Sequence, residues 1–163
     1  MVVADFSKAI GFVLSNEGGY EPPNTADPGG ETNFGISKRQ YPFLDIKKLT
    51  REEAIAIYER DYWKFDTITN QRVATKLLDA YVNMAPHEAI RLVQLALGAI
   101  QAGPIVADGK FGPDTLAHLN AADESRFIDE FKFQLVRFYD EDAKANPSAT
   151  AELHGWWRRA VKG

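Results

Sequence analysis

The chain has 163 residues, of which 45% are hydrophobic and 26% are charged, a composition typical of a packed globular protein and not of a disordered one. Its 19 Lys and Arg against 23 Asp and Glu leave a formal charge of −4, so we expect no nucleic-acid partner. The chain contains no Cys, which excludes disulfides, thiolate zinc sites and Cys nucleophiles. Packing alone must therefore stabilise the fold.

The first predicted helix has its apolar side chains at helical spacing and ends at Gly18-Gly19. Glu17 is therefore expected in the last helical turn. The following stretch, residues 18–35, is rich in Gly, Pro, Asn and Asp, which predicts a loop with at most a short β excursion. This loop is the part of the chain least typical of a core.

Capping signals predict that the rest of the chain is helical. Thr50 and Glu53 form a capping box that begins a helix ending near Tyr62. Further helices are expected to begin at Thr69 or Asn70, Pro86, Pro113, Asp123 and Ala149. The sequence thus predicts a mainly α protein with about seven or eight helices. We expect two regions, residues 1–86 and 87–163, packed as one body.

Two patterns that suggest other chemistry are rejected. Residues 30–37 imitate a phosphate-binding loop, but Ile36 stands where the lysine should be and Glu31 adds a negative charge. The histidines lack the paired spacing of a zinc site; they are His87, His118 and His154. We therefore expect no cofactor and no metal.

Glu17 is the first candidate for catalysis. A carboxyl group at the end of a helix meets the negative pole of the helix dipole and loses part of its hydration, and both effects favour its protonated form. A general acid needs that form near neutral pH. The small residues Gly18 and Gly19 allow a substrate to approach. A solvated Glu before a capping glycine is the alternative interpretation.

Asp27 and Thr32 lie in the same glycine-rich loop and supply a second carboxyl group and a hydroxyl group. Glycoside cleavage uses one carboxyl group to protonate the leaving oxygen and a second to stabilise the sugar or activate water. Asp27 precedes Pro28, so it also fits a turn-forming Asp. Glu31 competes with Asp27 as the second carboxylate.

Several motifs resemble glycoside hydrolase family 108, whose members are peptidoglycan-cleaving lysozymes and often phage endolysins. The resemblance rests on Glu17-Gly18-Gly19-Tyr20, on residues 27–37 and on Tyr58-x-x-x-Tyr62-Trp63. It continues through Asp79-x-x-x-Asn83, Asp108-Gly109-x-x-Gly112-Pro113-x-Thr115 and Gly155-Trp156-x-x-Arg159. The last two motifs are similar to the family's peptidoglycan-binding region, so the resemblance covers nearly the whole chain.

The resemblance implies a lysozyme-like helical fold, bacterial peptidoglycan as partner and Glu17 as general acid. The order Glu17, Asp27, Thr32 is similar to the Glu-Asp-Thr triad of T-even-type phage lysozymes, with different gaps between the three residues. The implied reaction is hydrolysis of the β-1,4 bond between N-acetylmuramic acid and N-acetylglucosamine. A lytic transglycosylase on the same bond, and a non-catalytic wall-binding or secretion-assisting protein, stay open as alternatives.

The substrate-binding candidates lie near the expected acid; they are Tyr20, Glu31, Asn33, Tyr62 and Trp63. Their aromatic rings can stack on sugars, although a Tyr-Trp pair at a helix end is more often core. The turn around Gly109 is better explained structurally, by glycines that permit a positive φ.

The cationic last helix, with Arg158 and Arg159, predicts at most weak contact with anionic wall or membrane lipid. Its charges also fit simple stabilisation of a helix C-terminus. We expect a monomer made in the cytoplasm without a signal peptide, acting on the periplasmic cell wall after release, since the first apolar run is short and interrupted.

Overall fold

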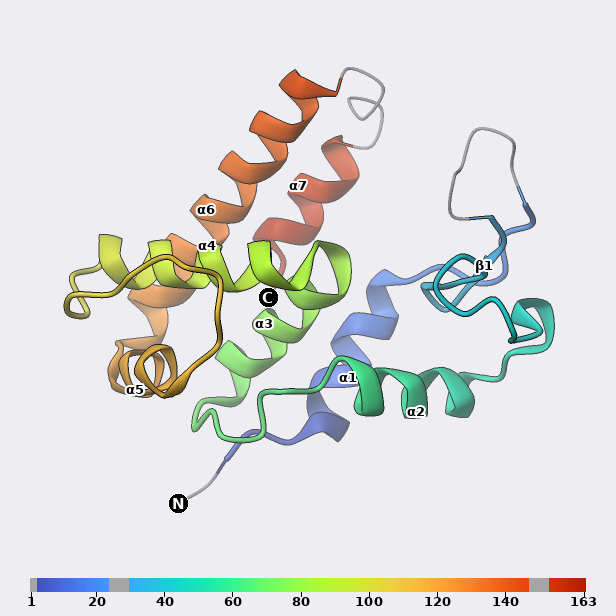
Figure 1. The fold of residues 1–163 in the computed structure, drawn as a ribbon, viewed down its shortest axis with the longest axis horizontal. Coiled ribbons are helices and arrows are strands. Elements are labelled where there is room, and N and C mark those ends of the chain that lie inside the picture. The colour runs from blue at the N-terminus through green and yellow to red at the C-terminus, as the bar shows by residue number, and fades with distance from the viewer. Residues whose placement is uncertain (1–2, 24–29, 147–152) are drawn as a thin grey trace.

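The computed structural model describes residues 3–23, 30–146 and 153–163 (Figure 1). Its elements are, in chain order, α1 (Phe6–Asn16), β1 (Thr32–Asn33), β2 (Ile36–Ser37), the 3₁₀ helix η1 (Ile46–Lys48), α2 (Arg51–Asp61), α3 (Gln71–Asn83), α4 (Pro86–Ala99), α5 (Pro113–Ala121), α6 (Glu124–Ala145) and α7 (Leu153–Val161). The prediction of a mainly α protein with very little β structure is confirmed. The predicted start of the last helix, at Ala149, lies outside the described residues.

The predicted caps begin the helices as expected. The Thr50 hydroxyl accepts from the backbone N–H of Glu53, and the Glu53 carboxylate accepts from that of Thr50, which completes the capping box of α2. Asn70 caps α3 and Asp123 caps α6 through their side-chain oxygens. Local sequence therefore determines where these helices begin.

One hydrophobic cluster joins the two predicted regions. Helix α1 packs along α3, α3 contacts α4, and α6 packs against both α4 and α7 (Figure 1). The largest fully buried side chains come from both sides of Pro86 and include Leu77 and Leu78 as well as Phe127 and Phe131. The core is thus continuous across the expected boundary.

The loop after α1 contains the small β excursion. Strands β1 and β2 pair antiparallel, with Asn33 opposite Ile36, and the backbone of Thr32 also pairs with that of Glu21. The two turn residues, Phe34 and Gly35, both have positive φ, 51° and 77°, as a tight two-residue hairpin requires. This hairpin folds the loop back towards the end of α1. Within the described parts of the chain, no helix has the length and apolar character needed to cross a membrane.

Candidate active site

The sequence predicted Glu17 within the last turn of the first helix. In the structure it lies one residue beyond the end of α1. Its backbone is extended, with φ −90° and ψ 144°, and its N–H donates to the carbonyl of Leu14. Its side chain is only 14% exposed, so the carboxyl group is largely removed from water while still reachable. The helix thus ends by directing this carboxyl group into the protein.

The hairpin turn encloses the carboxyl group of Glu17. A Cβ atom on Gly35 would lie 2.6 Å from Glu17 Oε2 and 2.5 Å from the Tyr58 hydroxyl oxygen, which leaves room for glycine alone. The Tyr58 hydroxyl donates to the carbonyl of Phe34 at 2.9 Å and so fixes the turn. Burial raises the pKa of Tyr58, and the charge of Glu17 raises it further.

Arg159, on α7, contacts the same carboxyl group from the other side. Its Nη2 donates to Glu17 Oε1 at 2.7 Å, and its Nε donates to Asp79 Oδ1 at 3.0 Å. Burial lowers the pKa of Arg159, but the carboxylates of Asp79 and Glu17 outweigh burial and raise it. The guanidinium group therefore bridges α1 and α3 through two carboxylates.

Asp79 and Lys76, both on α3, complete this network. Asp79 is 3% exposed and also accepts from the side-chain amide of Asn16 at 3.2 Å. Lys76, equally buried, donates through Nζ to the carbonyls of Arg159 and Lys162, at 2.9 and 2.7 Å. Burial lowers the pKa of Lys76 to about 8. Lys76 thus caps the end of α7 and holds Arg159 in place.

Comparison with known families matches both predicted regions of the chain. Residues 10–85, which include Glu17, Gly35 and Asp79, match the family model described as Glycosyl hydrolase 108. Residues 88–161, which include Arg159, match the model described as Predicted Peptidoglycan domain. The first region is therefore similar to glycosyl hydrolase family 108, and the second is similar to a peptidoglycan domain.

A solved structure has the same fold over nearly the whole chain. The structure of SagA from Brucella abortus is 26% identical in sequence, with a TM-score of 0.71, over 96% of this chain and 93% of that one. Comparison with the curated proteins found no match. The family matches support a glycoside hydrolase with a peptidoglycan domain, and the mainly α structure fits the expected lysozyme-like fold.

The other predicted catalytic residues follow α1 in the sequence. Asp27 lies outside the described residues. Glu31 precedes β1, and its Oε2 accepts from the hydroxyl of exposed Tyr20 at 3.0 Å. The backbone of Thr32 pairs on both sides, with Glu21 and Ser37, so its position is fixed by the small sheet. The assignment of the second carboxylate stays a prediction.

Two expected substrate contacts also have structural roles. Asn33 is 5% exposed, and its amide donates to the carbonyls of Ile46 and Leu49, so it supports the loop from inside. Trp63 packs against the rings of Phe6 and Phe65, at 5.6 and 5.9 Å between centroids, beside the N-terminal half of α1. We leave both residues out of the proposed site.

Tyr62 ends α2 with its ring centroid 5.4 Å from that of Tyr58. Tyr58 in turn fixes the hairpin turn that encloses Glu17, so Tyr62 packs next to a residue that contacts the candidate site. The contact of Tyr62 with sugar stays a prediction.

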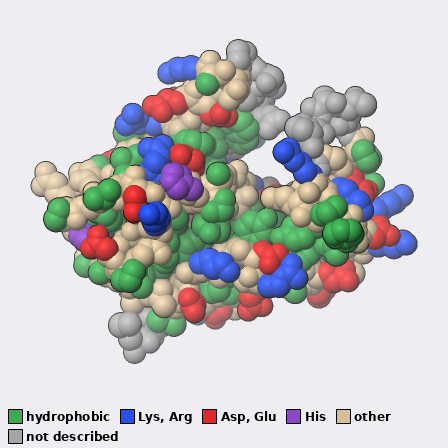
Figure 2. Space-filling model, viewed as in Figure 1, with side chains coloured by type: hydrophobic (Ala, Val, Ile, Leu, Met, Phe, Trp, Pro, Cys, Tyr) green, Lys and Arg blue, Asp and Glu red, His purple; other side chains and the backbone are tan. Residues whose placement is uncertain are grey.

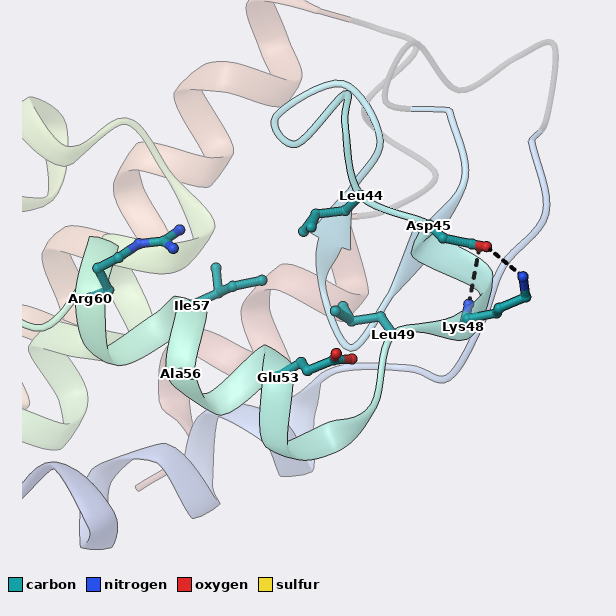
Figure 3. A pocket seen from close by; sticks show the side chains of 8 residues that line it. All are labelled: Leu44, Asp45, Lys48, Leu49, Glu53, Ala56, Ile57 and Arg60. Carbon is teal, nitrogen blue, oxygen red and sulfur yellow. Dashed lines mark hydrogen bonds and ion pairs between the residues drawn. The ribbon is translucent and has the colours of Figure 1, made fainter.

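A cavity of about 360 Å³ lies between residues 44–49 and α2 (Figure 3). Its polar groups already have structural partners. Asp45 pairs with Lys48 at 3.0 Å, Glu53 belongs to the capping box, and Arg60 pairs with Asp61. None of the predicted catalytic residues lines it, so it is separate from the candidate site.

The glycine turn of the second region has a structural explanation, as favoured from the sequence. Gly109 has a φ of 70°, and its N–H donates to the side chain of buried Gln94. The amide of Gln94 in turn donates to Asp108 and Thr115. This turn is therefore held from within α4.

Proposed function

We propose that the protein is an N-acetylmuramidase, a lysozyme that hydrolyses the β-1,4 bond between N-acetylmuramic acid and N-acetylglucosamine. The observation that carries this proposal is the carboxyl group of Glu17, 14% exposed, enclosed by the turn at Gly35 and held by Arg159. A carboxyl group that is positioned and partly desolvated suits general acid catalysis. The family and its peptidoglycan domain supply the substrate class.

The two oxygens of Glu17 have different roles in this proposal. Oε1 accepts from Arg159 and fixes the orientation of the carboxyl group. Oε2 carries the proton and donates it to the glycosidic oxygen as the bond to the leaving sugar breaks. Arg159 is thus a positioning residue, contributed by the peptidoglycan domain.

In the inverting form of the reaction, water attacks from the opposite face of the sugar as the glycosidic bond breaks. We assign activation of that water to Asp27 with Thr32, and keep Glu31 as the competing carboxylate. In an inverting enzyme the two carboxyl groups are about 6.5–9.5 Å apart, and in a retaining one about 5–5.5 Å. Anomeric product analysis by NMR distinguishes the two mechanisms, and Asp27→Asn against Glu31→Gln identifies the residue.

The test is mass spectrometry of fragments released from purified Gram-negative sacculi. Wild-type protein should release fragments with reducing muramic acid ends, and Glu17→Gln should release none above background. Glu52→Gln, exposed in the first turn of α2, is the matched control and should retain activity. Circular dichroism checks that each variant is folded.

Three results contradict the proposal in different ways. Anhydro-muramic ends identify a lytic transglycosylase. Binding to sacculi without any released fragment identifies a non-catalytic wall-binding protein. Full activity in Glu17→Gln assigns the acid to another residue.

A further inference from the structure

A second cavity, of about 560 Å³, lies directly beside the candidate acid. It is formed where the C-terminal ends of α1 and α3 meet α7. Its lining residues are Ser15, Asn16, Asn83, Gly155, Trp156, Arg158, Arg159 and Lys162. Figure 2 shows the molecular surface hollowed between the part that contains α6 and α7 and the part that contains the hairpin. None of the roles assigned above requires a ligand in this cavity.

The cavity has a strongly cationic lining in a protein whose net charge is −4. Arg158, Arg159 and Lys162 line it, and no carboxylate does so among the described residues. Lys162 Nζ donates to the side-chain oxygens of Ser15 and Asn16, which keeps its charge at the wall of the cavity. The chemistry of the lining therefore favours an anionic ligand.

Arg158 is the cation available to that ligand. It is exposed, and its Nε donates only to the backbone carbonyl of His154, at 3.3 Å. Arg159, by contrast, is already bound to Glu17 and Asp79. Among the described residues, no carboxylate pairs with Arg158. Its guanidinium group can therefore form a bidentate contact with a carboxylate.

The position of the cavity relates it to the scissile bond. Arg159 lines the cavity and holds Glu17, and Asn16, which also lines it, directly precedes Glu17. A group bound in the cavity therefore lies close to the glycosidic bond whose oxygen Glu17 would protonate. The two sugars of peptidoglycan are uncharged, and the lactyl group of muramic acid is joined by an amide bond to a stem peptide with free carboxylates.

We propose that this cavity binds the anionic stem peptide on the muramic acid next to the cleaved bond, with Arg158 contacting a peptide carboxylate. The inference rests on the proposed function, because it specifies which part of the peptidoglycan the site recognises. The half-buried ring of Trp156 supplies an apolar wall for the peptide backbone.

The test compares two soluble glycan substrates of equal size. In one the stem peptides keep their free carboxylates, and in the other the carboxylates have been converted to methylamides. We expect wild-type protein to show a higher kcat/KM on the charged substrate. Arg158→Gln should lower the charged-to-amidated ratio about tenfold, and Arg158→Glu should lower it further. The control Arg137→Gln, an exposed arginine on α6 paired with Glu141, should keep the wild-type ratio.

The outcomes separate the cavity from the catalytic proposal. Wild-type cleavage of both substrates with equal kcat/KM, or an unchanged ratio in Arg158→Gln, overturns the stem-peptide site and leaves the muramidase intact. Cleavage of neither substrate overturns the muramidase and, with it, this inference. A preference for the charged substrate that decreases from the wild type to Arg158→Gln and again to Arg158→Glu supports the site.

Discussion

At the scale of single residues, the carboxyl group of Glu17 depends on a neighbour that has no side chain. Gly35 occupies a positive φ of 77°, and its Cα faces both Glu17 Oε2 and the Tyr58 hydroxyl. Any larger residue must displace one of these groups. The geometry of the acid is therefore determined partly by the hairpin turn.

If Glu17 is the proposed acid, Gly35→Ala should lower peptidoglycan cleavage about a hundredfold, because a shift of about 1 Å in a catalytic group has an effect of that size. The left-handed backbone should also reduce the free energy of unfolding by roughly 1–2 kcal/mol. Turbidity assays on sacculi and urea denaturation measure the two effects. Gly11→Ala, an exposed helical glycine with open space around it, should keep activity and gain roughly 0.5–1 kcal/mol.

Arg159 and Asp79 should show strong energetic coupling. Asp79 is 3% exposed, so Arg159→Met removes the closer of its two cations, leaves Lys76 at 4.0 Å, and should cost about 3–5 kcal/mol. In an Asp79→Asn background the same change should cost about 1–3 kcal/mol less. A double-mutant cycle by urea denaturation measures this difference. Equal costs in both backgrounds contradict the proposed bridge.

The sequence indicated Glu17 as the candidate acid but did not indicate the residues that contact it. Glu17 could be singled out because its signals are local, namely a helix end followed by two glycines. Arg159 lies 142 positions later, and a contact over that distance depends on how α7 packs. One signal was present in Asp79, a carboxylate on a helix whose neighbours are apolar, since such a residue requires a cation when buried. The inward contacts of Asn33 and Trp63 were not predictable, because composition does not show which polar or aromatic side chains pack inside.

At the scale of elements, α7 depends on a lysine from α3. Lys76 donates to the carbonyls of Arg159 and Lys162, so the end of α7 is capped by a different helix. The starts of α2, α3 and α6 were predictable because each is encoded by its own cap. The packing of α7 was not, because it depends on Lys76 lying within an otherwise apolar stripe.

The capping lysine predicts a rise in stability at alkaline pH. Burial lowers the pKa of Lys76 to about 8 from 10.5, so between these values the unfolded chain binds more protons than the folded one. The free energy of unfolding contributed by this group therefore increases with pH across that window, by about 1–2 kcal/mol between pH 8 and 9.5. Urea denaturation at both pH values should show this increment in the wild type and not in Lys76→Met. The same increment in both proteins assigns it to other groups.

At the scale of the whole molecule, the two regions share one core and one ion-pair network. The hydrophobic cluster extends across Pro86, and Arg159 ties the last helix to the first. The two family matches meet at almost the same place as the predicted boundary. The side chains on the two sides of that boundary nevertheless pack into one hydrophobic cluster. Sequence motifs identify evolutionary units, whereas cooperativity depends on the contacts between them.

We predict a single unfolding transition for both regions. Trp63 reports on the first region, and Trp156 and Trp157 report on the second. In Trp63→Phe and in the double variant Trp156→Phe/Trp157→Phe, the urea midpoint from fluorescence should coincide with that from far-UV circular dichroism. Separate midpoints in either variant show that residues 1–86 and 87–163 unfold independently.

The bridge from Arg159 to Glu17 also has a consequence for the order in which a working enzyme arises during synthesis. Residues are added in chain order, so Arg159 is made 142 positions after Glu17. A nascent chain therefore contains the candidate acid long before the group that orients it, and a fragment that ends before α7 has Glu17 without Arg159. Such a fragment should release no fragments above background from sacculi, which protects the producing cell from partly made chains.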